Sequence, residues 1–158
     1  MKKFYPKKEA RIPFTKDGYD KLVAEQAALA ARRPEAVEHL RKAREMGDLS
    51  ENGYYKASRA ALSFLDARLR RANRLIKLAT IISSNGSGII QIGSVVKIFH
   101  KEKEITYTIV GGFESNPAHH TISHISPLGK ALIGKIKGDV VEFQVPAGIQ
   151  KYTILAIS

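Results

Sequence analysis

Two segments with heptad spacing on either side of Gly47 most constrain the fold of this chain. From Thr15 to about Ala79 the sequence is rich in Ala, Leu, Arg, Lys and Glu, which lose little on entering a helix. Mostly apolar or small residues recur there at spacings of three and four, with Gln26, Arg33 and Ser58 as weaker members. The positions of one segment mirror those of the other about residue 49. The mirrored pairs are Ala43 and Tyr55, Leu40 and Ser58, Ala36 and Leu62, Arg33 and Leu65, Leu29 and Leu69, Gln26 and Ala72, Leu22 and Ile76, and Tyr19 and Ala79.

This mirror symmetry predicts an antiparallel helical hairpin. Each arm would have about 30 residues and, at ~1.5 Å per residue, a length of roughly 45 Å. Pro34 lies inside the first arm, where it removes a backbone hydrogen bond, so we expect a bend or a restart of the helix there.

The residues from Gly93 onward follow a different pattern. Short runs rich in β-branched residues, separated by Gly, Pro, Asn and charged clusters, predict strands. Between two of them, "SPLGKALIG" predicts a short helix with Ser126 as its N-cap and Pro127 at its first position. We therefore expect an α+β protein, with a hairpin in residues 1–82, a tip at 47–52, a Ser- and Gly-containing linker at 83–92, and a small antiparallel sheet with one short helix in 93–158.

The composition excludes several classes of function. The chain has no cysteine, so it can form neither a disulfide nor a thiolate zinc site, and it has no cysteine nucleophile. The basic N-terminus is not followed by an apolar signal segment, and no stretch is long enough to span a membrane, so we expect a cytoplasmic protein. Glycine-rich loops of the Walker or dinucleotide type are absent.

The formal net charge of +11 is concentrated in the first half of the chain. Residues 1–80 contain 19 Lys or Arg and 10 Asp or Glu, whereas residues 81–158 contain 7 and 5. An excess of positive charge attracts polyanions and acidic protein surfaces. The predicted hairpin should therefore carry the surface that meets a partner.

The predicted tip, "MGDLSEN", places two carboxylates in this basic sequence. Asp48 and Glu51 have the spacing of a capping box, in which Asp48 accepts from an early backbone N–H of the following helix and Glu51 reaches back to the N-cap. Alternatively, they are two oxygen ligands for a hard cation such as Mg²⁺, which takes about six, so that a partner would have to complete the site. The spacing leaves both roles open, and the two roles are compatible.

Two separate motifs resemble one known family. "RRPEAVEHLRKAREMGDLSENGYYKASR" resembles the coiled-coil tip region of the bacterial Gre transcript-cleavage factors, whose signature is an acidic Gly-Asp-Leu-x-Glu-Asn turn between two long helices. "ISPLGKALIGKIKGDVVEFQVPAG" resembles the helix and strand of the family's C-terminal FKBP-like domain. The resemblance runs from about Ile12 to the end of the chain. It implies an N-terminal antiparallel coiled-coil hairpin followed by an FKBP-like antiparallel sheet domain with one short helix.

The resemblance implies a transcription elongation factor that is not itself an enzyme. Such factors insert their coiled coil into the secondary channel of RNA polymerase and stimulate the polymerase to cleave the 3′ end of backtracked RNA, which rescues arrested complexes. It implies that Asp48 and Glu51 are the catalytic pair and hold Mg²⁺ jointly with the polymerase, and that Asn52 orients the turn or contacts the active site. Gly53 and Tyr54 depart from the Ala-Glu pair common in the family, which puts the efficiency or the cleavage length in doubt.

The resemblance also gives roles to residues outside the acidic pair. Arg44 and Arg59 match family positions of a basic patch that faces the extruded RNA, and Arg41 and Lys56 lie near them, although a solvated helix face would explain the same charges. The turn that begins at Ser126 and Pro127 touches the rim of the polymerase channel in the family. We expect RNA polymerase and the backtracked RNA 3′ end as partners, DNA binding as in other transcription proteins, no membrane, and a monomer.

Two other functions stay open at this point. The first is a Gre homologue that plugs the channel and inhibits the polymerase without cleavage, against which the presence of both carboxylates argues. The second is a basic coiled-coil module that binds nucleic acid or a partner helix directly. This second function requires tight, salt-dependent binding to free RNA.

Overall fold

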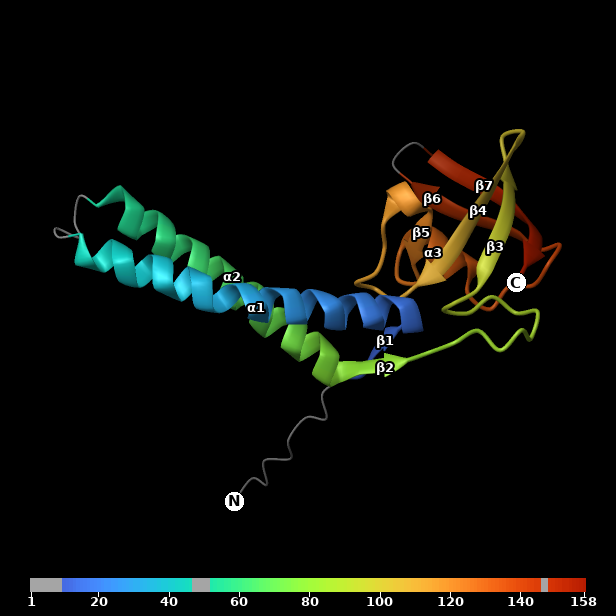
Figure 1. Ribbon diagram of the computed structural model, residues 1–158. Coiled ribbons are helices and arrows are strands. Elements are labelled where there is room, and N and C mark those ends of the chain that lie inside the picture. The colour runs from blue at the N-terminus through green and yellow to red at the C-terminus, as the bar shows by residue number, and fades with distance from the viewer. Residues whose placement is uncertain (1–9, 47–51, 146–147) are drawn as a thin grey trace, which may run out of the picture. The chain divides into compact units, whose positions relative to one another are not determined.

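The computed structural model describes residues 10–46, 52–145 and 148–158, which contain a helical hairpin and a strand-rich domain (Figure 1). By their contacts they form two compact units. One is Asp20–Leu78, and the other joins the residues up to Tyr19 to Ala79–Ser158. This arrangement confirms the predicted α+β fold. Among the described residues, no helix has the length and apolar character that crossing a bilayer requires.

The hairpin consists of helices α1 (Lys16–Glu45) and α2 (Gly53–Leu78), which run antiparallel and side by side (Figure 1). All of the buried residues recorded for the two helices belong to the predicted seams. They are Leu29, Ala43, Ser58, Leu65 and Ala72. The mirrored heptads therefore predicted the contact face of both helices. Of the bend or restart expected at Pro34, the restart is not observed, since α1 continues through this exposed residue as one helix.

Arg33 is the one exposed residue among the predicted seam positions in α1 and α2, and it bonds across the hairpin. Its Nε donates to Oδ1 of Asp66 at 2.8 Å. This hydrogen bond is the main cause that lowers the pKa of Asp66 below its ordinary value. Arg68 also pairs across the hairpin, with Glu25. Ion pairs at the edge of the seam thus join the two helices.

A short parallel pair of strands, which the sequence analysis did not predict, precedes α1 and follows α2. β1 (Ile12–Phe14) pairs with β2 (Ala79–Ile81). Next to β1, the hydroxyl of Thr15 accepts from the backbone nitrogen of Gly18 at 3.0 Å and so caps the start of α1. The carboxylate of Glu114 accepts from the backbone nitrogens of Thr15 and Gly111, both at 3.0 Å. These contacts fix the first turn of α1.

The second unit is built on a sheet of five strands with the order β5-β4-β3-β7-β6. The strands are β3 (Val95–His100), β4 (Lys103–Val110), β5 (Thr121–Ser123), β6 (Val140–Val145) and β7 (Gly148–Ile157). Neighbouring strands are antiparallel except β4 and β5, which are parallel. A 3-10 turn (Pro117–His119) precedes β5, and the short helix α3 (Pro127–Leu132) follows it. The sheet is therefore mainly antiparallel, as expected, with one parallel edge.

The core of this unit lies between the sheet and α3. Leu132 of α3 is fully buried together with Val96 and Ile98 of β3. Ile90 belongs to the same buried cluster, although it lies in the segment 83–92 that the sequence analysis expected to be a linker. The backbone of Ile90 also bonds to Lys135 at 2.9 Å. The C-terminal end of that segment is thus part of the domain.

Candidate functional site

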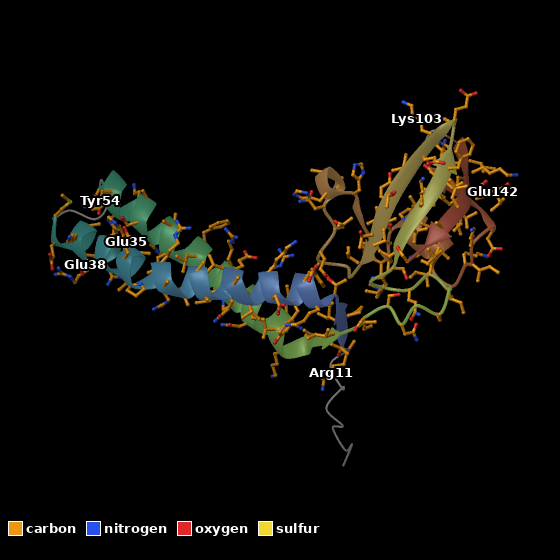
Figure 2. All side chains as sticks on the ribbon, turned by 45° about the vertical axis from the view of Figure 1, so that its right-hand side comes forward. Arg11, Glu35, Glu38, Tyr54, Lys103 and Glu142 are labelled. Atoms are coloured by element: carbon orange, nitrogen blue, oxygen red, sulfur yellow. The ribbon has the colours of Figure 1, made fainter. Side chains whose placement is uncertain are left out.

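The candidate site lies at the end of the hairpin where α1 stops and α2 starts. The predicted acidic pair, Asp48 and Glu51, lies outside the described residues. The structure does describe the last turn of α1, which ends at Glu45, and Asn52, which precedes α2. Figure 2 shows Glu35, Glu38 and Tyr54 grouped at this end of the hairpin.

Asn52 joins the two helix ends with one side chain. Its Oδ1 accepts from the backbone nitrogen of Tyr55 at 2.9 Å, which is the geometry of a helix N-cap. Its Nδ2 donates to the carbonyl oxygen of Ala43 in the last turn of α1 at 2.8 Å. Asn52 is therefore the N-cap of α2, directly before its first residue, Gly53.

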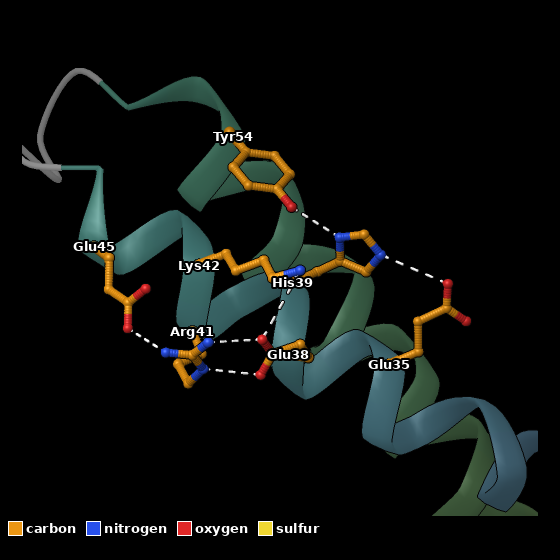
Figure 3. A network of polar contacts seen from close by, with 7 residues as sticks. All are labelled: Glu35, Glu38, His39, Arg41, Lys42, Glu45 and Tyr54. Carbon is orange, nitrogen blue, oxygen red and sulfur yellow. Dashed lines mark hydrogen bonds and ion pairs between the residues drawn. The ribbon is translucent and has the colours of Figure 1, made fainter.

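A chain of polar contacts crosses the hairpin next to this cap (Figure 3). The hydroxyl of Tyr54, in the first turn of α2, lies 2.8 Å from Nδ1 of His39 in α1. The two rings meet edge to face, with their centroids 6.4 Å apart. The other ring nitrogen of His39, Nε2, lies 3.6 Å from Oε1 of Glu35, one turn earlier in α1. These contacts tie the start of α2 to the side of α1.

Arg41, a predicted nucleic-acid ligand, is engaged within α1 (Figure 3). Its Nη2 and Nε donate to the two carboxylate oxygens of Glu38 at 2.7 and 2.8 Å, and its Nη1 pairs with Glu45. The hydrogen bond from Arg41 is the main cause that lowers the pKa of Glu38. The same contacts raise the pKa of Arg41. Two carboxylates therefore compete with any phosphate for this guanidinium.

The other predicted basic residues, Arg44, Lys56 and Arg59, are all exposed at the same end of the hairpin. The charge of α2 is more one-sided than that of α1. Helix α2 carries seven Lys or Arg and one Asp, whereas α1 carries seven Lys or Arg and six Asp or Glu. The excess positive charge of the hairpin therefore belongs mainly to α2.

Several of the α2 cations share one face of the helix, which we call the α2 stripe. Its members are Lys56, Arg59, Arg70, Arg74 and Lys77, all exposed. Positions 56, 59, 63, 66, 70, 74 and 77 follow one another at steps of three or four residues, so they lie on one face of the helix. The stripe occupies all of these positions except 63 and 66. Asp66 interrupts the stripe, but its charge is paired with Arg33. The stripe is therefore a positively charged surface that suits a polyanion.

Ser126 and Pro127 begin α3 as the sequence predicts. The Ser126 hydroxyl accepts from the backbone nitrogen of Gly129 at 3.0 Å and donates to the carbonyl oxygen of Ser123 at 2.7 Å. These two bonds account for Ser126 as the N-cap of α3. Pro127 and Ile125 are exposed beside it and remain accessible to a partner.

The residues that the structure describes contain no group of three or more His, Asp or Glu side chains that could hold a metal ion. Oxygen ligands from two carboxylates fill only part of the coordination sphere of Mg²⁺, which takes about six ligands.

Sequence reasoning missed the two cross-hairpin contacts of this site. One signal for the Asn52 cap was available, because Asn is among the preferred N-cap residues. The contact of His39 with Tyr54 had no comparable signal. Neither residue lies on the apolar seam, and an edge contact between two helices depends on how the helices are rotated.

Comparisons with known proteins agree with this arrangement of domains. Residues 12–81 match the family described as "Transcription elongation factor, N-terminal", and residues 85–158 match "Transcription elongation factor, GreA/GreB, C-term". The transcription elongation factor GreA of Nitratiruptor sp. is 40% identical over 153 residues, which cover 94% of each chain. GreA of Thermoanaerobacter pseudethanolicus is 39% identical and covers 92% of this chain and 96% of the relative. The crystal structure of GreA factor homolog 1 of Thermus thermophilus, 28% identical, covers 94% of this chain and 99% of its own, with a TM-score of 0.44.

Proposed function

Because this chain belongs to the GreA/GreB family of transcription elongation factors, we propose that it acts on RNA polymerase and stimulates cleavage of backtracked RNA. In this proposal the hairpin enters the secondary channel of the polymerase. With 30 and 26 residues in its helices, it has a reach of about 40 Å at ~1.5 Å per residue. The polymerase performs the hydrolysis, and the factor is not a nuclease by itself.

The cap supplied by Asn52 is the observation that carries the proposal. Since Asn52 accepts from the backbone of Tyr55, α2 does not require Asp48 or Glu51 as its N-cap. A metal-binding role for Asp48 and Glu51 is therefore compatible with the capping of α2. Their place in the chain, between the ends of two long helices, suits delivery into another protein's active site.

The donor chemistry of the acidic pair fits Mg²⁺, a hard cation that takes oxygen ligands. Asp48 and Glu51 would hold the ion together with carboxylates of the polymerase. When bound, Mg²⁺ supplies positive charge that stabilises the attacking and leaving oxygens of phosphoryl transfer. Within this chain, Asn52 fixes the point at which the acidic segment joins α2.

The basic residues at the same end of the hairpin would hold the RNA. Arg44, Lys56 and Arg59 are exposed, and contacts of Lys and Arg with phosphates position a nucleic acid without reading its sequence. A factor that acts on any stalled transcript requires this lack of sequence preference. Pro127 and the backbone near Ser126 would contact the rim of the channel, and one monomer would serve one polymerase.

A cleavage assay on a stalled, backtracked polymerase complex tests the proposal. The chain should shorten the RNA faster than a control without it. The variant with Asp48→Asn and Glu51→Gln should cleave no faster than that control and should still compete with the unchanged chain for the polymerase. If the unchanged chain binds and blocks the polymerase without cleavage, it is an inhibitor. Tight, salt-dependent binding to free RNA without polymerase would indicate a nucleic-acid module instead.

A further inference from the structure

We propose that Glu35, His39 and Tyr54 form a tip latch, a chain of side-chain contacts that positions the acidic end of the hairpin for cleavage. The inference rests on the proposed function. It gives a role to Glu35 and His39, which the resemblance does not mention, and to Tyr54, where this chain departs from the family. Tyr54 comes from the first turn of α2, and the other two residues come from α1 (Figure 3).

The three side chains of the latch contact one another in sequence. The Tyr54 hydroxyl lies 2.8 Å from Nδ1 of His39, within hydrogen-bonding distance. Nε2 of the same ring faces Oε1 of the Glu35 carboxylate at 3.6 Å. The edge-to-face contact of the two rings adds a second, apolar attachment between His39 and Tyr54.

The latch and the Asn52 cap hold the same turn of α2 in two different ways. Asn52 bonds to the backbone of Ala43, near the end of α1, whereas Tyr54 bonds to His39, one turn earlier. Two attachments at different heights along α1 resist rotation of this turn, which a single attachment would allow. The acidic segment joins the chain at Asn52, so the orientation of this turn sets where the segment begins.

Small displacements are costly in catalysis, which is why an exposed latch can matter. His39 and Glu35 side chains are 54% and 76% exposed, so the latch contributes little to the stability of the hairpin. A misplacement of ~1 Å at a reacting centre, however, can slow a reaction by roughly 100-fold. The latch should therefore affect the rate of cleavage more than folding or polymerase binding.

The test uses the full chain with Tyr54→Phe, His39→Leu and the double variant. Tyr55→Phe is the matched control, because it removes the same hydroxyl from a ring one residue away that lies on the seam. Cleavage is measured at saturating factor, and the factor concentration for half-maximal cleavage is measured separately. Amide hydrogen exchange of the free protein, without polymerase or metal, measures how well the first turn of α2 is ordered.

Each latch variant should reduce the saturating cleavage rate by about threefold to tenfold, the range expected for one lost hydrogen bond. The half-maximal concentration should stay unchanged. The double variant should lose no more than His39→Leu alone, because His39→Leu already removes the contact that Tyr54→Phe removes. Exchange at the amides of Tyr55 and Lys56 should become faster in Tyr54→Phe than in Tyr55→Phe.

Two outcomes would overturn the latch. One is an unchanged cleavage rate in Tyr54→Phe while the unchanged chain cleaves RNA. The other is additive losses in the double variant, which would show that the two side chains act separately. If the unchanged chain stimulates no cleavage at all, the proposed function fails. The hydrogen-exchange comparison then still decides whether the latch orders α2.

Discussion

The amide nitrogen Nδ2 of Asn52 lies 2.8 Å from the carbonyl oxygen of Ala43, so the residue before α2 bonds to the last turn of α1. Its Oδ1 accepts from the backbone of Tyr55 at 2.9 Å. The final carbonyls and the first N–H groups of any helix lack partners inside that helix. Asn52 bonds to one such carbonyl of α1 and to one such N–H group of α2, and it thereby links the two helix ends.

Two replacements of Asn52 should distinguish the contributions of its two hydrogen bonds to stability. Asn52→Ala removes both and should destabilise the hairpin by about 1–2 kcal/mol, the usual cost of a lost N-cap with a further hydrogen bond. Asn52→Asp keeps an oxygen that can cap α2 but cannot donate to Ala43, so it should lie between Asn52→Ala and the unchanged chain. Urea unfolding followed by helical circular dichroism measures both. Equal stability of all three proteins would mean that neither bond contributes.

Neighbouring residues on α2 should respond differently to truncation. Leu65 lies on the seam and is 9% exposed, whereas Phe64 beside it is 66% exposed. Leu65→Ala should cost about 2–5 kcal/mol, because it removes buried methyl groups and leaves a cavity. Phe64→Ala should change stability by no more than about 0.5 kcal/mol. The same unfolding measurement compares them, and a larger loss for Phe64 would mean that the seam faces elsewhere.

The hairpin was predictable because its signal is periodic. Seam residues such as Leu29 and Leu65 repeat at helical spacing, and burial follows that spacing along both helices. The start of α3 was predictable as well, since Ser126 followed by Pro127 is a local signal that does not depend on distant contacts. Both features depend on patterns among residues that lie close together in the sequence.

The features that the sequence did not predict depend on residues far apart in the chain. Strands β1 and β2 have three residues each and gain their partners only because the hairpin returns the chain to its start. Glu114 binds the backbone of Thr15 across 99 residues. The role of Ile90 as core residue follows from the position of α3 and not from its Ser- and Gly-rich neighbours. Each of these features is determined by tertiary contacts.

The Asp66–Arg33 pair predicts how the hairpin responds to acid. The guanidinium of Arg33 lowers the folded-state pKa of Asp66 below its ordinary value of 3.8. A carboxyl whose pKa is lowered on folding stabilises the folded state above its ordinary pKa, and this contribution is lost as the pH falls through the lowered pKa. The pair is exposed, so the effect should be small and should weaken in salt.

The melting temperature of Asp66→Asn, compared with that of the unchanged chain, measures this contribution. At pH 7 the variant should melt slightly below the unchanged chain. The difference should shrink as the pH falls below 3.8 and should vanish once Asp66 is protonated in the folded state. A difference that persists unchanged at lower pH would mean that Asp66 acts through its shape and not its charge.

The contacts of Arg41 predict that it differs from Arg59 in RNA binding, although both lie near the end of the hairpin. Arg41 donates to Glu38 at 2.7 and 2.8 Å and also pairs with Glu45, so a phosphate would have to displace two carboxylates. Arg59 is an exposed member of the α2 stripe. Arg59→Ala should therefore weaken the factor in backtracked complexes more than Arg41→Ala does.

The salt dependence of the factor concentration for half-maximal cleavage distinguishes the two variants. Loss of one phosphate contact should lower the slope of log affinity against log salt by roughly 0.7, the value for a single strand. Arg59→Ala should show this change, and Arg41→Ala should keep the slope of the unchanged chain. Equal changes in both slopes would show that Arg41 leaves Glu38 and Glu45 when RNA binds. The acidic residues of α1 would then act as exchangeable partners for that guanidinium.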